Sequence, residues 1–226
     1  MKLVVASHNP HKAAEIRAIL GNIPDLEIVS LGSGLPEIVE DKDTFLGNAA
    51  KKAIETARAI SGKVLPGDSA GGDFRPRRGG VRSEGKSFPG VAGIAVLADD
   101  SGLSVDALNG APGVYSARYA GENATSVQLC EKLLRELKDV PPARRTAHFI
   151  TVLVVADSEK ILYTAEGKVE GLITEEMRGA QGFGYDPVFY YPPLQKTFAE
   201  LMPEEKNKHS HRYRALQNLL TQLKTG

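Results

Sequence analysis

Short apolar runs and runs rich in β-branched residues mark the strands that the sequence predicts. A run that is apolar throughout is typical of a buried strand, and turn residues bound most of these runs. Asp157 and Ser158 separate two of the runs and therefore predict a hairpin. The strands are expected at residues 2–6, 26–31, 94–98, 103–105, 146–156, 160–164 and 168–173.

Apolar residues at helical spacing predict four helices, of which the third covers residues 126–138. Residues that cap helices well precede the other three, and glycines end two of those. The caps are Asn9 (with Pro10 after it), Asp43 or Thr44, and Ser210; the glycines are Gly21 and Gly62. The residues expected on the buried faces are Ile16, Ile19, Leu20, Phe45, Ala49, Ala53, Ala57, Ile60, Val127, Cys130, Leu133, Leu134, Leu137, Ala215, Leu216, Leu219, Leu220 and Leu223.

Strands interspersed with helices, some of them in antiparallel hairpins, predict an α/β fold with a mixed sheet. The 226 residues suffice for a single domain, 1–226, with one core or two lobes. Residues 63–93 interrupt the pattern, because 66–93 holds eight of the 23 glycines and three prolines. This insertion is either a mobile surface segment or a basic flap over an anionic ligand, with the cations Arg75, Arg77, Arg78, Arg82 and Lys86.

The composition excludes several classes of function. Lys plus Arg number 28 and Asp plus Glu also number 28, so no overall positive field favours nucleic acid or an anionic membrane. The single cysteine, Cys130, excludes an intrachain disulfide and a cysteine zinc site, and it fits a reducing cytoplasm. No stretch resembles a signal peptide or could span a bilayer. An anionic ligand would therefore need a local cluster of cations.

Two lysines follow polar residues at spacings that suit phosphate. Ser7, Asn9 and Lys12 lie at a predicted turn from strand to helix, where free backbone N–H groups and the helix dipole favour an anion. Asn48 and Lys52 are four residues apart and share one face of the second helix. The plain structural alternative is that Asn9 only caps its helix and that both lysines are solvated.

Asp99 and Asp100 end an apolar run, and Ser101 and Gly102 follow them. Adjacent carboxylates repel each other, so cations are expected opposite them. Carboxylates near phosphates favour Mg²⁺, with Glu40 as a further ligand and the substrate completing the shell. Alternatively, these residues form a capping turn at the end of the strand.

The segments 182–187 and 204–212 form a further candidate site. Glycines around Phe183 and Tyr185 let a ligand approach the backbone, and an aromatic ring can stack on a base. Alternatively, the rings are core and the cations of the second segment are exposed. Taken together with Mg²⁺, the four candidate sites would surround a polyphosphate with the cations Lys12, Lys52, Lys206 and Arg212.

Five stretches of the sequence resemble the inosine triphosphate pyrophosphatase family. They are "ASHNPHKAAEI", "VEDKDTFLGNAAKKA", "ADDSGLSVDALNGAPGVYSARYAG", "GFGYDPVF" and "TFAELMPEEKNKHSHRYRAL", and only 63–93 lies outside the pattern. The resemblance implies Mg²⁺-dependent hydrolysis of ITP, dITP and XTP to the monophosphate and pyrophosphate. It also implies an elongated mixed sheet that forms two lobes with the site between them, and usually a homodimer. Gly47 and Lys42 depart from the family, which commonly has Glu and Gly there.

The resemblance also suggests a role for each candidate residue. Asp100 matches the general base, and Glu40 resembles the metal-binding acid, with Asp99 a further candidate ligand. We expect Lys12 and Lys52, together with Lys206, to assist catalysis by neutralising the leaving pyrophosphate. The substrate-binding residues would be Ser7, His8, Asn9, Pro10, His11, Lys12, Asn48, Lys52, Ser101, Phe183, Gly184, Tyr185, Asp186, Lys206, His211 and Arg212.

Selectivity for a purine 6-carbonyl would come from hydrogen-bond donors, either backbone N–H groups near residues 183–186 or Arg212. Three other functions stay open at this stage. One is a Maf-like pyrophosphatase for other modified nucleotides, and another is a nucleotide-binding protein that has lost turnover. The weakest is a nucleic-acid interface through residues 75–82, because the rest of the chain has no basic excess.

Overall fold

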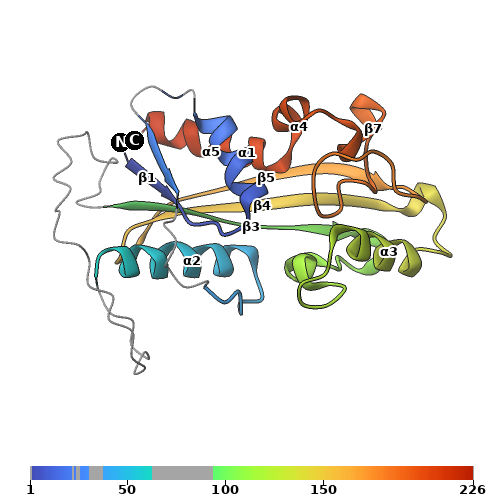
Figure 1. The fold of residues 1–226 in the computed structure, drawn as a ribbon, viewed down its shortest axis with the longest axis horizontal. Coiled ribbons are helices and arrows are strands. Elements are labelled where there is room, and N and C mark those ends of the chain that lie inside the picture. The colour runs from blue at the N-terminus through green and yellow to red at the C-terminus, as the bar shows by residue number, and fades with distance from the viewer. Residues whose placement is uncertain (1, 22, 24–25, 31–37, 63–93, 226) are drawn as a thin grey trace.

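The computed structural model describes residues 2–21, 23, 26–30, 38–62 and 94–225, so the predicted insertion at 63–93 lies outside the described residues. One elongated sheet runs through the molecule and is covered by helices on both faces (Figure 1). Its seven strands follow the order β2-β1-β3-β4-β5-β6-β7. Their bounds are β1 Lys2–Val5, β2 Glu27–Ser30, β3 Ala95–Val105, β4 Thr146–Ala156, β5 Ile161–Ile173, β6 Phe189–Tyr191 and β7 Lys196–Thr197.

The sheet is mixed, which confirms the predicted fold class. β1 pairs in parallel with β2 and with β3, whereas each pair from β3 to β7 is antiparallel. Two expected breaks are absent, because β3 and β5 each run as one strand. Asp99 to Gly102 lie within β3 and pair with Leu153 to Ile150 of β4, so this segment is not the turn that its composition suggested.

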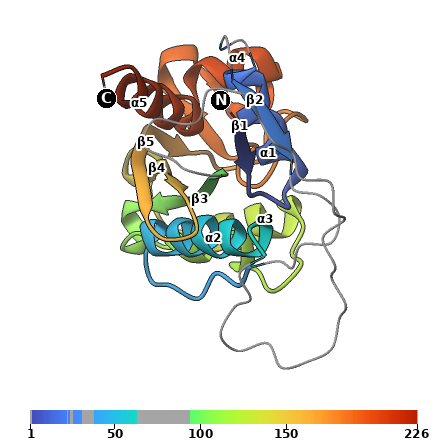
Figure 2. The same cartoon turned by 90° about the vertical axis from the view of Figure 1, so that its left-hand side faces the viewer.

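The helices form one layer on each side of the sheet. Those on one face are α1 Pro10–Leu20, α4 Pro203–His209 and α5 His211–Thr225; those on the other are α2 Phe45–Ile60 and α3 Ser126–Glu136 (Figures 1 and 2). The predicted caps Asn9, Thr44 and Ser210 each accept hydrogen bonds from the first turn of their helices. The sequence analysis missed α4. None of the described helices combines the length and apolar character that a membrane crossing requires.

The core follows the alternation of side chains along β3. Ala95 and Leu97 point toward α1 and α5, whereas Val96 and Ala98 point toward the alanine stripe of α2. A third cluster includes Leu129, Cys130, Leu133 and Leu137 around α3. Val127 was predicted in that cluster but is 52% exposed. It lies six residues before Leu133 and hence about 120° away around the helix.

Gly167 lets α5 approach the sheet closely. A Cβ atom at this position of β5 would collide with the backbone of His211 and Ala215 in α5. Only glycine therefore allows α5 to lie at its observed height above β5. This contact fixes the start of α5, which carries His211 and Arg212.

Candidate active site

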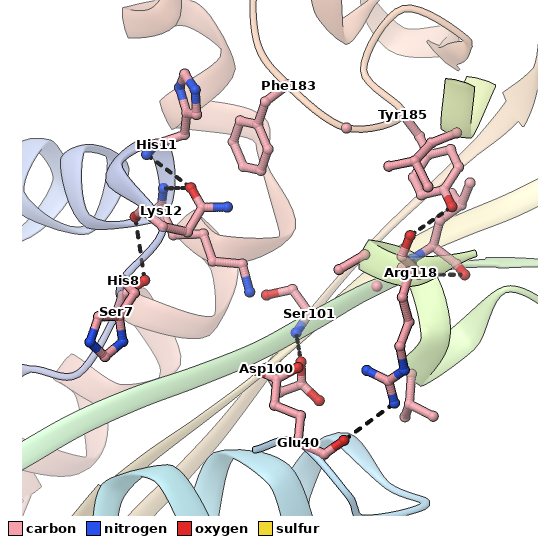
Figure 3. A pocket seen from close by; sticks show the side chains of 18 of the residues that line it. Ser7, His8, His11, Lys12, Glu40, Asp100, Ser101, Arg118, Phe183 and Tyr185 are labelled. Atoms are coloured by element: carbon pink, nitrogen blue, oxygen red, sulfur yellow. Dashed lines mark hydrogen bonds between the residues drawn. The ribbon is translucent and has the colours of Figure 1, made fainter. Parts of the chain in front are cut away.

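A cleft of about 830 Å³ lies where α1, α2, β3, the short helix η2 (Gly113–Arg118) and the loop at 183–186 meet. Among the predicted site residues, all but Pro10, Asn48 and Asp99 line it. Figure 3 shows His11 and Lys12 on one side of Asp100 and Arg118 on the other. The lining residues that were predicted are Ser7, His8, Asn9, His11, Lys12, Glu40, Lys52, Asp100, Ser101, Phe183, Gly184, Tyr185, Asp186, Lys206, His211 and Arg212.

Asp99 points toward α1 and α5, where it contacts the cations that were expected opposite two adjacent carboxylates. Its Oδ2 lies 3.4 Å from Lys12 Nζ and 3.2 Å from Arg212 Nη2, and it accepts a hydrogen bond from the Ser101 hydroxyl at 2.9 Å. Burial would raise the pKa of Asp99, but the charges of Lys12, Arg212 and Lys52 lower this pKa well below its usual value. Asp99 does not line the cleft, and its role as a metal ligand stays a prediction.

Asp100 points the other way, toward α2 and the cleft. Asn48 Nδ2 donates to its Oδ2 at 2.9 Å, and the backbone N–H of Ser101 donates to its Oδ1 at 2.9 Å. Burial and the negative charge of Glu40 raise the pKa of Asp100 above its usual value. The pKa values of the two neighbouring aspartates are therefore shifted in opposite directions, because consecutive side chains of a strand point to opposite faces of the sheet.

Asn48 is a positioning residue rather than a lining residue. It is fully buried, its Nδ2 holds Asp100, and its Oδ1 accepts from Lys42 N at 2.9 Å. The predicted contact of Asn48 with substrate stays a prediction. The two departures from the family pattern also meet here, because a Cβ on Gly47 would lie 2.9 Å from the Cβ of Lys42.

Lys52 lies between the carboxylates of the cleft. Its Nζ is 2.5 Å from Glu40 Oε1 and also donates to the backbone carbonyl of Asp99. Burial would lower the pKa of Lys52, but the attraction of Asp99, Glu40 and Asp100 outweighs burial and raises it. Lys52 therefore stays charged beside Asp100.

Glu15 organises the remaining cations, and the sequence analysis did not identify it. Its carboxylate accepts from Lys206 Nζ at 2.8 Å and bonds Arg212 Nη1. Lys206 also donates to Asp186 Oδ2 at 2.6 Å. Burial, Arg212 and Lys206 lower the pKa of His211 well below its usual value, so its ring is neutral at pH 7.

Four backbone N–H groups and one hydroxyl that were predicted as donors for substrate already have acceptors within the protein. The N–H groups of His11 and Lys12 donate to Asn9 Oδ1 at 3.0 and 3.2 Å, so the first turn of α1 does not offer them to phosphate. The N–H of Phe183 donates to Asp186 Oδ2 at 2.8 Å, and that of Gly184 donates to Ser126 Oγ at 2.8 Å. Substrate contacts at these backbone groups stay predictions, and each would require the present hydrogen bond to be exchanged. The Ser101 hydroxyl likewise bonds Asp99 and Thr151.

The loop at 183–186 is rigidly held beside α1. Tyr185 OH donates to the Ser116 carbonyl of η2 at 2.8 Å, and a Cβ on Gly182, whose φ is +75°, would collide with Asp186 Oδ2. The rings of His11 and Phe183 lie nearly parallel, at 17°, with their centroids 5.2 Å apart. They place two flat faces at the cleft, where a base could stack.

The carboxylates of the cleft suit a divalent cation. Four cations (Lys12, Lys52, Lys206 and Arg212) and five carboxylates (Glu15, Glu40, Asp99, Asp100 and Asp186) form its ionic network, so with all nine charged the network carries one net negative charge. A triphosphate would therefore meet no excess of positive charge from these groups. Glu40 lies close enough to Asp100 for its negative charge to raise the pKa of Asp100. The described residues include no cluster of three or more His, Cys, Asp or Glu side chains fit to hold a metal alone. Two carboxylates with substrate oxygens completing the shell are typical of Mg²⁺.

Comparison with known proteins identifies the family. The model of the Ham1 family matches residues 3–71 and 82–222. This chain belongs to the Ham1 family. Only residues 72–81 of the stretch at 63–93 lie outside the Ham1 match, so the interruption of the family pattern is shorter than the sequence analysis took it to be.

Individual relatives align with nearly the whole chain. A dITP/XTP pyrophosphatase of Leuconostoc mesenteroides is 46% identical over 222 residues, covering 97% of this chain and 94% of the relative. One of Clostridium perfringens is 43% identical over 225 residues, covering 99% and 97%. The solved structure of a HAM1 protein from Coxiella burnetii covers all of both chains, with a TM-score of 0.77 and 36% identity.

Proposed function

We propose that this protein is a nucleoside triphosphate pyrophosphatase that hydrolyses dITP, XTP and ITP to the monophosphate and pyrophosphate with Mg²⁺. The observation that carries the proposal is the environment of Asp100. This carboxylate lies in a cleft with a raised pKa, beside Glu40 and the charged Lys52. Membership of the Ham1 family and the printed activity of the two bacterial relatives support the same reaction.

Asp100 would act as the general base. It accepts a proton from a water molecule whose oxygen forms a bond to the α-phosphorus, while the bond from that phosphorus to the bridging oxygen breaks and pyrophosphate leaves with the electron pair. In the protein without bound metal, the raised pKa of Asp100 makes its carboxylate a stronger base than an exposed aspartate. Asn48 and the Ser101 N–H orient the carboxylate from behind.

The cations around Asp100 would stabilise the charge that develops on pyrophosphate. Lys12 and Lys52 are 17% and 14% exposed at their side chains, so both can reach a ligand in the cleft. Mg²⁺, when bound at Glu40 and Asp100, would supply the additional positive charge that a triphosphate requires. Lys206 and Arg212 are more deeply buried, and both pair with Glu15.

Selectivity for a 6-carbonyl would depend on Arg212 rather than on the loop at 183–186. The amides of Phe183 and Gly184 have protein acceptors, whereas Arg212 Nε is buried without a hydrogen-bond partner. A buried donor that lacks an acceptor costs about 1–3 kcal/mol. A carbonyl oxygen would relieve this cost, and the amino group of adenine would not.

Release of pyrophosphate tests the proposal. We expect rapid release from dITP and XTP with Mg²⁺, slow release from dATP, and negligible release without a divalent cation. Equal rates for dITP and dATP would contradict the selectivity. Binding of dITP without release would instead indicate a nucleotide-binding protein, and preference for methylated or pyrimidine nucleotides would indicate a Maf-like activity. The homodimer and the cytoplasmic location stay predictions. Light scattering, which measures the molar mass in solution, tests the homodimer.

A further inference from the structure

The cations that line the cleft differ in what they contact. Lys12, Lys52, Lys206 and Arg212 each bond at least one carboxylate side chain. Arg118 also lines the cleft, yet among the described residues it contacts no carboxylate. The sequence analysis did not single out Arg118, because nothing in its local sequence distinguishes it from a solvated arginine.

Two contacts hold Arg118 in the cleft. It is the last residue of η2, and its Nη2 donates to the backbone carbonyl of Glu40 at 3.3 Å. Its Cζ lies 4.9 Å from the centroid of the Tyr115 ring. In Figure 3 the side chain extends toward Glu40 and lies on the other side of Asp100 from Lys12. Arg118 is thus half-buried, oriented and adjacent to the proposed reaction centre.

The chemistry of this contact leaves most of the guanidinium available. An arginine has five N–H donors in a planar fork that matches two phosphate oxygens, and the carbonyl of Glu40 accepts from Nη2 alone. A backbone carbonyl carries no formal charge, so the positive charge of Arg118 is not neutralised by a neighbouring anion. An aromatic ring and a carbonyl position an arginine without consuming its capacity for an anionic ligand.

We infer that Arg118 is a phosphate-binding residue, which contacts the triphosphate from the wall of the cleft opposite Lys12. The inference rests on the proposed function for the identity of the substrate, but the phosphate contact itself does not require turnover. Arg118 would complete a ring of cations around the phosphate chain, with Lys12 on the other side of Asp100 and Lys52 bonded to the Glu40 carboxylate.

Calorimetric titration with inorganic triphosphate in the presence of Mg²⁺ tests the contact directly. R118Q should weaken triphosphate binding by about 10- to 100-fold, the loss typical of a charge-assisted hydrogen bond. R58Q is the matched control, because Arg58 also donates to a backbone carbonyl, that of Ser158 at 3.0 Å, and does not line the cleft. It should bind triphosphate as the wild type does. Binding by R118Q within twofold of the wild type would overturn the inference. If R118Q does not fold, R118M is judged by the same criterion.

A double-mutant cycle separates phosphate binding from positioning of Glu40. If Arg118 contacts phosphate itself, R118Q should weaken triphosphate binding in an E40Q background by the same factor as in the wild type. Loss of the effect in E40Q would show that Arg118 acts only through Glu40 and would overturn the inference. Wild type that binds triphosphate in this way but releases no pyrophosphate from dITP would contradict the proposed function alone.

Discussion

The two faces of β3 treat neighbouring aspartates in opposite ways. Toward α1 and α5, Asp99 is compensated by Lys12 and Arg212 and has a strongly lowered pKa. Toward α2, Asp100 faces Glu40 and has a raised pKa. The first environment stabilises a carboxylate, whereas the second keeps one reactive at some cost to stability. One strand can therefore carry a structural ion pair and a candidate base at consecutive positions.

The largest expected effect separates the two faces by activity. D100N should lower turnover of dITP by about 10²- to 10⁴-fold, because the amide cannot accept a proton from water. Nucleotide binding should change much less. The measurement is pyrophosphate release at saturating dITP, with affinity followed by calorimetry. Turnover within tenfold of the wild type would remove Asp100 from the role of base.

For stability we expect the opposite order, with a larger loss from a substitution of Asp99 than from one of Asp100. D99N removes the buried carboxylate that Lys12 and Arg212 share, so we expect the free energy of unfolding to fall by about 3 kcal/mol. D100N is the matched control. Since the fold raises the pKa of Asp100, the charged carboxylate is disfavoured at pH 7, and its loss should leave stability unchanged or increase it. Urea denaturation of both variants measures the difference, and equal losses would contradict the comparison.

Asn48 tests whether the α2 face adjusts Asp100. N48A removes a hydrogen bond that lowers the pKa of Asp100, so that pKa should rise and the acidic limb of the pH–rate profile should move to higher pH. We expect kcat to fall by about tenfold with KM for dITP nearly unchanged.

T44A is the control on the same helix. It removes the cap at Gly47 N and should cost about 1 kcal/mol of stability without moving that limb. An unchanged limb in N48A would show that Asn48 supports only the fold.

The smallest expected effect concerns the α5 face. His211 has a lowered pKa in the folded state, so below about pH 6.5 the unfolded chain binds a proton that the folded protein does not. Stability should therefore fall as the pH decreases from 7 to 5, by up to about 1.4 kcal/mol per pH unit from this residue. H211Q should show a shallower decline in urea denaturation across this range. Parallel curves for both proteins would exclude a contribution of His211.

Local signals account for much of the fold that the sequence predicted. Asn9, Thr44 and Ser210 cap their helices through atoms within three residues, so the sequence alone contains the relevant partners. The continuity of β3 through Asp99 to Gly102 is different. Composition favoured a turn there, but pairing with β4 residue by residue keeps the segment extended. Propensity is overridden where tertiary pairing is available.

The candidate site was predictable in its residue types and only partly in its contacts. Glu15 bonds Lys206 and Arg212, which lie 191 and 197 residues away, so no local pattern could connect them. The same holds for Arg118 and Glu40, 78 residues apart. A sequence shows that cations and carboxylates are present, whereas the fold decides which of them neutralise each other.

The close approach of α5 to Gly167 makes the cleft vulnerable from a strand that contributes none of its lining residues. A methyl group there would act as a wedge beneath the first turns of the helix. Arg212 would move away from Asp99, and the ion pair between Asp99 and Lys12 would weaken in turn. A substitution at Gly167 can thus disturb the cleft although Gly167 does not line it, because the missing side chain is what lets α5 lie close to the sheet.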